Sequence, residues 1–245
     1  MLNSSIKAVF FDLYGTLLVF NDFDEANDKW TNAFYDLAGK PNNISFEEVQ
    51  IICKDILESH VEKDSSKGFT TYETKIYNSF EQKNIFLERD QLRNIADVTV
   101  GIWQKNVALA EDTKSVLSKL KKTKKLALIT NFDHSPHIYK VLTETGLENY
   151  FDLILISDET CSKKPDPAIF KSALKYFSLK PEQAVYIGDN VYDDIKGAFN
   201  SAIEPILISR NSKSNNHVNT DKIIRQYNLP KFKIIKSLSE LVVNF

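Results

Sequence analysis

The residues of this 245-residue sequence that are best suited to chemistry stand where apolar runs end. Asp12 directly follows the apolar run 6–11, and Tyr14, Gly15 and Thr16 come next. A carboxylate and a glycine turn after a buried strand are typical of the edge of an active site. A lone aspartate after an apolar strand is usually a turn or helix-cap residue, so the interpretation of Asp12 depends on the residues at the ends of the other strands.

Polar residues follow three later apolar runs in the same way. They are Thr130 and Asn131, then Lys163 and Lys164 before Pro165, and finally Gly188 and Asp189 with Asp193 and Asp194. If the strands are neighbours, their carboxyl ends bring these side chains into one cleft. Carboxylates can hold Mg²⁺ or attack phosphorus, and lysine and hydroxyl groups can balance the charge of a transferring phosphoryl group. The inventory therefore indicates phosphoryl chemistry.

The elements that must position these residues alternate between strand and helix in the second half of the chain. Strand-like apolar runs are expected at 6–11, 125–131, 151–157, 184–189, 204–209 and, at the edge, 232–237. Helical patterns at 137–147, stopped near Gly146, and at 166–177 lie between them. Alternating βα units predict an α/β fold with a Rossmann-like parallel sheet covered by helices on both faces.

Residues from about 22 to 105 have a different pattern, which is helical without a convincing strand. Ser45 with Glu48, and Thr70 with Glu73, match the capping box that begins a helix. We therefore expect an α-helical domain at 19–104, inserted into a Rossmann-like core made of residues 1–18 and 105–245.

In their order along the chain, these motifs resemble the haloacid dehalogenase-like (HAD) hydrolase superfamily, in the branch with a helical cap. The matching positions are Asp12-Leu13-Tyr14-Gly15-Thr16 for the family's DxDGT, Thr130 for its second motif, Lys164 for its third, and Gly188-Asp189 with Asp193 and Asp194 for its fourth. The helical insert resembles the family's cap, so the resemblance covers nearly the whole chain and implies a hydrolase.

The resemblance implies that Asp12 is the nucleophile and that the enzyme uses Mg²⁺. The second oxygen of Asp12, the backbone carbonyl of Tyr14 and the carboxylate of Asp189 would help to hold the metal. Asp193 or Asp194 would bind the metal or its waters, and the sequence leaves both open.

The phosphoryl group of a small phosphorylated substrate would be contacted by Thr130 and Lys164, again by resemblance. Lys164 would also pair with Asp12, and its place before Pro165 favours it over Lys163. Thr16 and Asn131 are the expected substrate-binding residues.

Tyr14 departs from the family pattern, because most of the family's phosphatases place a second aspartate there. That aspartate protonates the leaving oxygen and later activates water, whereas tyrosine, with an ordinary pKa of about 10, is a poor base at neutral pH. The 2-haloacid dehalogenases of the same superfamily resemble this chain at Tyr14. They attack carbon with the same aspartate and need no metal.

The fourth motif favours phosphoryl chemistry over dehalogenation. Dehalogenases have a Ser-Ser-Asn type of sequence there and an early cap arginine, whereas this chain keeps Asp189 and has no arginine before Arg89. Converging carboxylates repel one another, and a divalent cation relieves that repulsion. We therefore expect a Mg²⁺-dependent phosphatase. A metal-independent 2-haloacid dehalogenase is the first alternative, and a weakly catalytic binding protein of the same fold is the second.

The composition excludes several classes of partner. The formal net charge is −2 and no basic run occurs, so we expect neither nucleic acid nor a membrane surface as a partner. Cys53 and Cys161 have no CxxC spacing, and we expect both to be reduced in a cytoplasmic protein. His134 and His137 lack ligand spacing and are expected at a helix start or on the surface. Monomer and homodimer both remain open.

Overall fold

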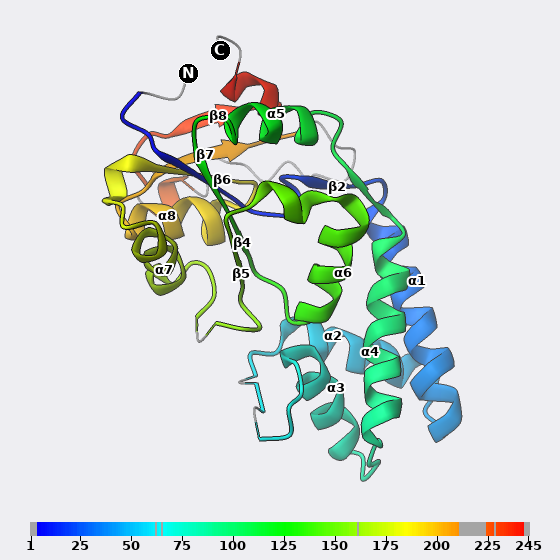
Figure 1. Cartoon of the computed structure of the whole chain (residues 1–245). Helices are drawn as coiled ribbons and strands as arrows, with labels where there is room; N and C mark the ends of the chain where they lie inside the picture. Colours follow the sequence, from blue (N-terminus) through cyan, green and yellow to red (C-terminus); the bar gives the residue numbers. More distant parts are fainter. Residues whose placement is uncertain are drawn as a thin grey trace. The chain divides into compact units, whose positions relative to one another are not determined.

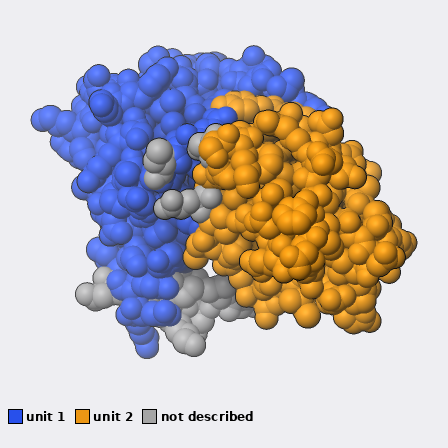
Figure 2. Space-filling model, turned by 90° about the horizontal axis from the view of Figure 1, so that it is seen from below, with its two compact units in different colours: residues 1–20, 108–131, 141–245 blue, residues 21–107, 132–140 orange. Residues whose placement is uncertain are grey.

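The computed structural model describes residues 4–61, 63–64, 66–160, 162–210, 224–227 and 229–242. The chain divides into two compact units, coloured separately in Figure 2. Unit 1 contains residues 1–20, 108–131 and 141–245, and unit 2 contains residues 21–107 and 132–140. Cys161 lies outside the described residues, while Cys53 is a free, buried cysteine of unit 2.

Unit 1 is built on a six-stranded sheet with the order β5-β4-β1-β6-β7-β8, in which every neighbouring pair is parallel (Figure 1). The strands are β1 (Ala8–Phe11), β4 (Lys125–Thr130), β5 (Leu153–Ile156), β6 (Ala184–Gly188), β7 (Glu204–Ile208) and β8 (Lys233–Ile235). The predicted α/β fold with a Rossmann-like parallel sheet is confirmed. Since β1 lies between β4 and β6, the three strands that carry most of the predicted site are adjacent.

The central strands are apolar on both faces because helices cover both sides of the sheet. The covering helices are α5 (Thr113–Leu120), α6 (Ser135–Thr145), α7 (Pro167–Phe177) and α8 (Gly197–Asn200). In Figure 1, α7 and α8 lie together on the side of the sheet opposite α5. Side chains of α7 such as Ile169 and Phe170 form one buried cluster with Phe10 of β1 and Tyr186 of β6.

Local capping explains where two of these helices begin and end. Asp166 caps α7 by accepting a hydrogen bond from the backbone N–H of Ala168, and Pro167 occupies the first helical position. Gly146 follows α6 with a φ of +69°, a left-handed conformation that stops the helix where the sequence predicts.

A second, two-stranded sheet pairs β2 (Leu18–Phe20) with β3 (Val107–Leu109). The sequence pattern does not predict this sheet, because three-residue strands leave almost no periodic pattern. The turn before β2 is fixed by long-range hydrogen bonds to the carbonyl of Leu17, from the N–H of Ala110 at 3.1 Å and from the hydroxyl of Thr113 at 2.9 Å.

Unit 2 is helical, as predicted for this part of the chain. Its main helices are α1 (Phe23–Phe34), α2 (Phe46–Glu58), α3 (Thr71–Glu81) and α4 (Arg89–Gln104), and the short helices η1 (Tyr35–Gly39) and η2 (Lys40–Asn42) follow α1. Both predicted capping boxes are present, at Ser45 for α2 and at Thr70 for α3. A buried cluster that includes Trp30, Phe34 and Phe80 forms its core. None of the described helices has the length and apolar character needed to cross a membrane.

Unit 2 also includes the segment 132–140, which lies outside the expected insertion 19–104. The Asp133 carboxylate pairs with Lys75 Nζ at 2.8 Å, and the rings of His134 and His137 are buried. His134 Nδ1 lies 2.9 Å from the hydroxyl of Thr70. Both histidines lie at the start of α6, one of the two positions expected for them, and each ring is packed into the helical unit.

Candidate active site

Asp12 is the first residue after β1, and the parallel pairing of β1 with β6 positions it. Its N–H donates to the carbonyl of Ile187 at 2.9 Å, which continues the ladder one residue past the strand. The carboxylate is only 6% exposed, and Oδ1 accepts a hydrogen bond from Lys164 Nζ at 2.6 Å. A buried carboxylate with a lysine partner is thus present at the carboxyl edge of the sheet.

Lys164 occupies the centre of the site and is 3% exposed. Besides Asp12, its ammonium group donates to Asp194 Oδ1 at 2.7 Å and to the hydroxyl of Tyr186 at 2.8 Å. The neighbouring Lys163 is more exposed, so the structure brings Lys164 rather than Lys163 to the carboxylates. The two carboxylates raise the pKa of Lys164 against the opposing effect of burial, so the ammonium group stays protonated.

Asn131 holds the loop that carries Lys164. Its side-chain nitrogen donates to the carbonyl of Lys164 and its side-chain oxygen accepts from the N–H of Lys164, both at 2.8 Å. From the sequence, Asn131 is expected to bind substrate, whereas both ends of its amide contact the Lys164 backbone. These two hydrogen bonds tie the end of β4 to the lysine loop.

Of the two aspartates in the fourth motif, the structure brings Asp194 to the lysine. Asp194 is buried, and its Oδ2 accepts from the N–H of Asn190 at 2.9 Å. Asp194 lies in the π-helical turn η5 (Val191–Lys196), and Asn190 is the N-cap of that turn. Asp193 is half-buried and hydrogen-bonded to Asn131, and burial raises its pKa with a further contribution from Asp194.

Asp12, Asp189 and Asp194 each present a carboxylate oxygen within 4.8 Å of the other two. Gly15 permits this approach, because it has a φ of +83° and a Cβ there would lie 2.1 Å from Asp189 Oδ2. Gly188 has a matching role, since a Cβ there would lie 2.2 Å from Asp194 Oδ2. Any side chain at either glycine would therefore displace one carboxylate.

Burial and mutual repulsion disfavour the ionised forms of these carboxylates. Burial raises the pKa of Asp12 to about 6, with Lys164 opposing the shift and Asp194 adding to it. Asp189 has a large accessible surface, but desolvation by the surrounding protein and the charges of Asp12 and Asp194 raise its pKa well above the ordinary value. When all three carboxylates are ionised, their negative charge exceeds the positive charge of Lys164. Hard oxygen ligands of this kind fit a divalent cation such as Mg²⁺.

Tyr14 lies beside Asp12, with its ring stacked on Phe20 at a centroid distance of 6.2 Å. Its backbone forms a β-bridge with Leu18. Burial and the Asp12 carboxylate raise the pKa of the Tyr14 phenol above its ordinary value. The phenol therefore stays protonated at neutral pH and cannot serve as a general base.

The two predicted threonines, Thr16 and Thr130, are both buried. Thr16 is fully buried, and its hydroxyl donates to Asp12 Oδ2 across a long 3.4 Å contact. Thr130 is the buried last residue of β4, the strand next to β1. The Thr16 carbonyl accepts from Arg210 at 3.0 Å, and Arg210 in turn pairs with Asp112 at 2.9 Å.

Two residues of this network were not predicted. Tyr186 contributes the hydroxyl that contacts Lys164, and the only sequence signal for it is a polar atom in the middle of an apolar strand. Arg210 supports the turn after Asp12, and its partners lie about 100 and 200 residues away in sequence, so no local pattern identifies it.

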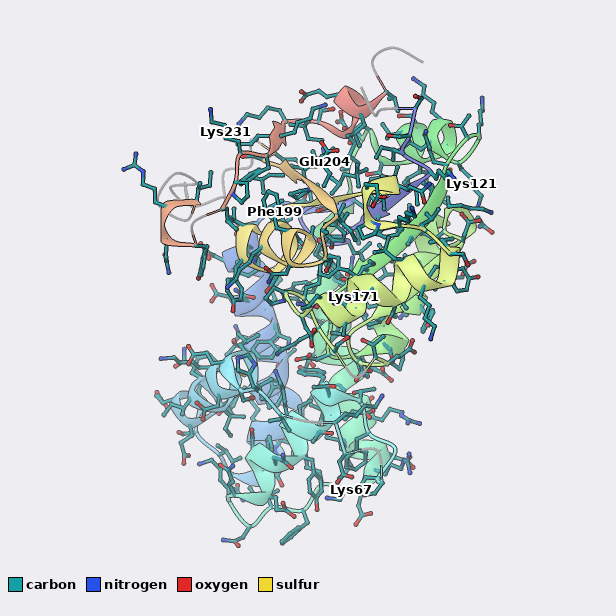
Figure 3. The ribbon with its side chains drawn as sticks, turned by 90° about the vertical axis from the view of Figure 1, so that its left-hand side faces the viewer. Lys67, Lys121, Lys171, Phe199, Glu204 and Lys231 are labelled. Carbon is teal, nitrogen blue, oxygen red and sulfur yellow. The ribbon has the colours of Figure 1, made fainter. Side chains whose placement is uncertain are left out.

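A cavity of about 520 Å³ lies elsewhere in unit 1, at the amino end of β7. Phe199, Glu204 and Lys231 line it and are labelled in Figure 3. The acidic residues described above follow the carboxyl ends of the strands, where ligands bind in parallel sheets, so this cavity is separate from the candidate active site.

Comparisons with known proteins agree with this α/β fold. The family model for haloacid dehalogenase-like hydrolases matches residues 6–201. A curated relative, human (Homo sapiens) N-acylneuraminate-9-phosphatase, is 27% identical over 215 residues, covering 85% of this chain and 84% of that protein. A glyceraldehyde 3-phosphate phosphatase of Methanothermobacter thermautotrophicus is 28% identical, covering 83% and 86%.

Solved structures show the same fold. A HAD phosphatase from Thermococcus onnurineus is similar with a TM-score of 0.64 and 24% identity, covering 96% of each chain. A 2-haloacid dehalogenase from Pseudomonas syringae is similar with a TM-score of 0.65 and 24% identity over the same shares. The chain belongs to the haloacid dehalogenase-like hydrolases, as the motifs predict, and it is therefore a hydrolase.

Proposed function

We propose that this hydrolase is a Mg²⁺-dependent phosphatase of small phosphorylated metabolites that works through an aspartyl-phosphate. The observation that carries the proposal is the group of three carboxylates, Asp12, Asp189 and Asp194, around the single cation of Lys164. A divalent cation would neutralise the remaining charge, and phosphoryl transfer uses such a cation, whereas displacement of halide from carbon needs none.

The nucleophile in this proposal is Asp12. Lys164 donates to Oδ1 at 2.6 Å, whereas Thr16 donates to Oδ2 across a longer 3.4 Å contact, so in this proposal Oδ2 is the oxygen that attacks phosphorus. The bond from phosphorus to the ester oxygen would break as the bond from Asp12 Oδ2 to phosphorus forms, and the departing oxygen would take a proton from solvent water. Water would then attack the aspartyl-phosphate, releasing phosphate and restoring the Asp12 carboxylate.

The remaining site residues have supporting roles in the proposal. Lys164 and Thr130 would contact the phosphoryl oxygens and balance their charge. Thr16 and Asn131, expected to bind substrate, would act here through the Asp12 carboxylate and the Lys164 loop.

Mg²⁺ would be held by Asp12, the Tyr14 carbonyl, Asp189 and Asp194, and when bound it would stabilise charge on the transferring group. Asp193 is the less suitable of the paired aspartates, because it lies outside the group of converging carboxylates.

The phosphatase relatives support the substrate class, since two of them cover more than four fifths of this chain. We further propose that the helical unit acts as a cap that selects the substrate. A cytoplasmic location and a monomeric or homodimeric state remain predictions.

Dehalogenation of a 2-haloacid is the second candidate, and Tyr14 is the observation that favours it. A protonated phenol beside Asp12 cannot activate water as the usual aspartate does. The acidic fourth motif opposes this alternative.

A panel of phosphate esters and 2-haloacids, assayed with Mg²⁺ and with chelator, tests the proposal. We expect phosphate release that requires Mg²⁺ and falls at least about 10³-fold in Asp12→Asn, because the amide is not a nucleophile. The matched control is Asp166→Asn, which should keep activity because asparagine caps a helix as well as aspartate does. Chloride release from 2-chloropropionate in chelator, without phosphatase activity, would establish the dehalogenase instead.

A further inference from the structure

Tyr186 places a hydroxyl in the middle of the apolar sheet. It lies on β6 and is 0% exposed, with its ring packed edge-on against Phe170 at a centroid distance of 5.0 Å. Its neighbours Val185 and Ile187 are purely apolar and equally buried. A hydroxyl at such a position destabilises the fold unless it is hydrogen-bonded, so its partners show what it does there.

The Tyr186 hydroxyl has three polar neighbours among the described residues, and all belong to the candidate site or to the strand beside β1. They are Lys164 Nζ at 2.8 Å, Asp194 Oδ1 at 2.9 Å and the carbonyl of Ile129 at 3.1 Å. A lysine ammonium group can only donate, so the Tyr186 oxygen accepts from Lys164. The phenol proton is then available to Asp194 or to the Ile129 carbonyl.

This arrangement uses all three N–H groups of the Lys164 ammonium. One donates to Asp12, one to Asp194 and the third to Tyr186. Because Lys164 is almost completely buried, water has little access to a released N–H. Removing the phenol oxygen would leave the ammonium with one unsatisfied donor and two competing carboxylates.

We infer that Tyr186 is a positioning residue, whose hydroxyl holds the Lys164 ammonium between Asp12 and Asp194. This inference rests on the proposed phosphatase function, in which Lys164 must contact both the nucleophile and the transferring phosphoryl group. Without the hydroxyl, Lys164 shifts toward one carboxylate and the phosphoryl group loses part of its charge balance in the transition state. The effect falls on turnover, because substrate binding draws on other groups as well.

Tyr186→Phe in the full chain tests this inference, since it removes one oxygen and keeps the ring. The matched control is Phe170→Leu, which disturbs packing against the same ring and leaves every hydrogen bond of Lys164 in place. Two measurements are made on each variant. The first is kcat and KM for an aryl phosphate with saturating Mg²⁺, and the second is the rate of Lys164 acetylation by acetic anhydride, followed by mass spectrometry.

For Tyr186→Phe we expect kcat to fall about 10- to 100-fold, the size of one hydrogen bond to a charged group, with KM changed less than about threefold. Lys164 acetylation should become several times faster. Phe170→Leu should lower the melting temperature but keep the wild-type kcat and acetylation rate.

Wild-type kcat and a wild-type Lys164 acetylation rate in Tyr186→Phe would overturn the inference, as would equal effects in Phe170→Leu. If the wild-type protein hydrolyses no phosphate ester, the proposed function fails. The acetylation rates still decide in that case whether Tyr186 positions Lys164, so the two failures are distinguishable.

Discussion

At the scale of single residues, Tyr14 determines how fast the proposed reaction can run. Its phenol lies beside Asp12 and its pKa is raised by burial and by that carboxylate, so it cannot accept a proton from water. Attack on phosphorus by Asp12 does not need this base, but hydrolysis of the aspartyl-phosphate does. In the proposed mechanism we therefore expect the second step to be the slower one.

The prediction for Tyr14→Asp rests on this missing base. Steady-state phosphate release should rise by about tenfold or more, because a positioned general base contributes about 10²–10⁴-fold in enzymes. A rapid-quench experiment should also show a burst of alcohol release in the wild type, about one equivalent per enzyme, and a smaller burst in the variant.

Tyr14→Phe is the matched control, since it keeps the ring on Phe20 and removes only the hydroxyl. Its rate should stay close to that of the wild type. Unchanged or lower activity in Tyr14→Asp would show that another group already accepts the proton from water, and the burst would then be absent.

At the scale of secondary-structure elements, glycines and turns bring the acidic residues together. The π-helical turn η5 places Asp194 where its carboxylate meets both Lys164 and the N–H of Asn190. Gly15 and Gly188 leave room for Asp189 and Asp194. The site therefore depends on backbone geometry as much as on the identity of the acids.

The turn after α8 contains a non-glycine residue with a positive φ. Ala202 has a φ of +57°. Its N–H donates to the carbonyl of Phe199 at 3.0 Å. This left-handed position after a helix favours glycine, because a Cβ crowds the following carbonyl.

Ala202→Gly should therefore raise the free energy of unfolding by about 0.5–1 kcal/mol. This is because the relief of backbone strain in the folded chain exceeds the cost of the extra entropy that glycine has in the unfolded chain. Urea denaturation would measure the change. Ala198→Gly, in the helical part of α8, is the control and should lower the free energy of unfolding by about 1 kcal/mol. Equal destabilisation by both changes would contradict the prediction.

At the scale of the whole molecule, the chain forms two units, and the polypeptide passes from one unit to the other four times. Residues 132–140 follow directly on Thr130 and Asn131, yet they are packed into the helical unit. Trp30 and Trp103, the two tryptophans of the sequence, both lie in unit 2. Tryptophan fluorescence therefore reports unfolding of the helical unit.

His137 should make the stability of the helical unit depend on pH. Burial lowers its pKa to about 4, with added contributions from His134 and Lys140, and Asp97 opposing them. Its Nε2 lies 3.2 Å from the side-chain oxygen of Gln104. The folded unit favours the neutral form of the His137 ring. The contribution of His137 to the free energy of unfolding is therefore complete above the ordinary histidine pKa of about 6.5 and is lost as the pH falls toward 4.

Urea unfolding, followed by tryptophan fluorescence, should show that the free energy of unfolding falls between pH 6.5 and 4, with up to about 3 kcal/mol of the decrease coming from His137. His137→Gln should flatten that slope, because glutamine does not titrate and can still donate to Gln104. Identical pH slopes in the wild type and in His137→Gln would contradict the assignment.

Local patterns in the sequence were sufficient for much of the fold. The alternation of apolar strands with helices predicted the parallel sheet, and Ser45 and Thr70 predicted helix starts that the structure confirms. These features depend on residues within one or two turns of each other, so they can be read without knowledge of the fold. The order of polar residues after the strands likewise predicted the family.

Tertiary structure decided which of these polar residues meet. Asp193 and Asp194 are adjacent in sequence, and only the turn η5 directs Asp194 to Lys164. Tyr186 gains its role from Lys164 and Asp194, and Asn131 joins the lysine loop, through side-chain contacts that have no local periodicity. The sequence by itself determined the fold and the set of reactive groups, because both arise from short-range patterns. The connections within the site arise from packing between distant segments, and only the folded chain decides those.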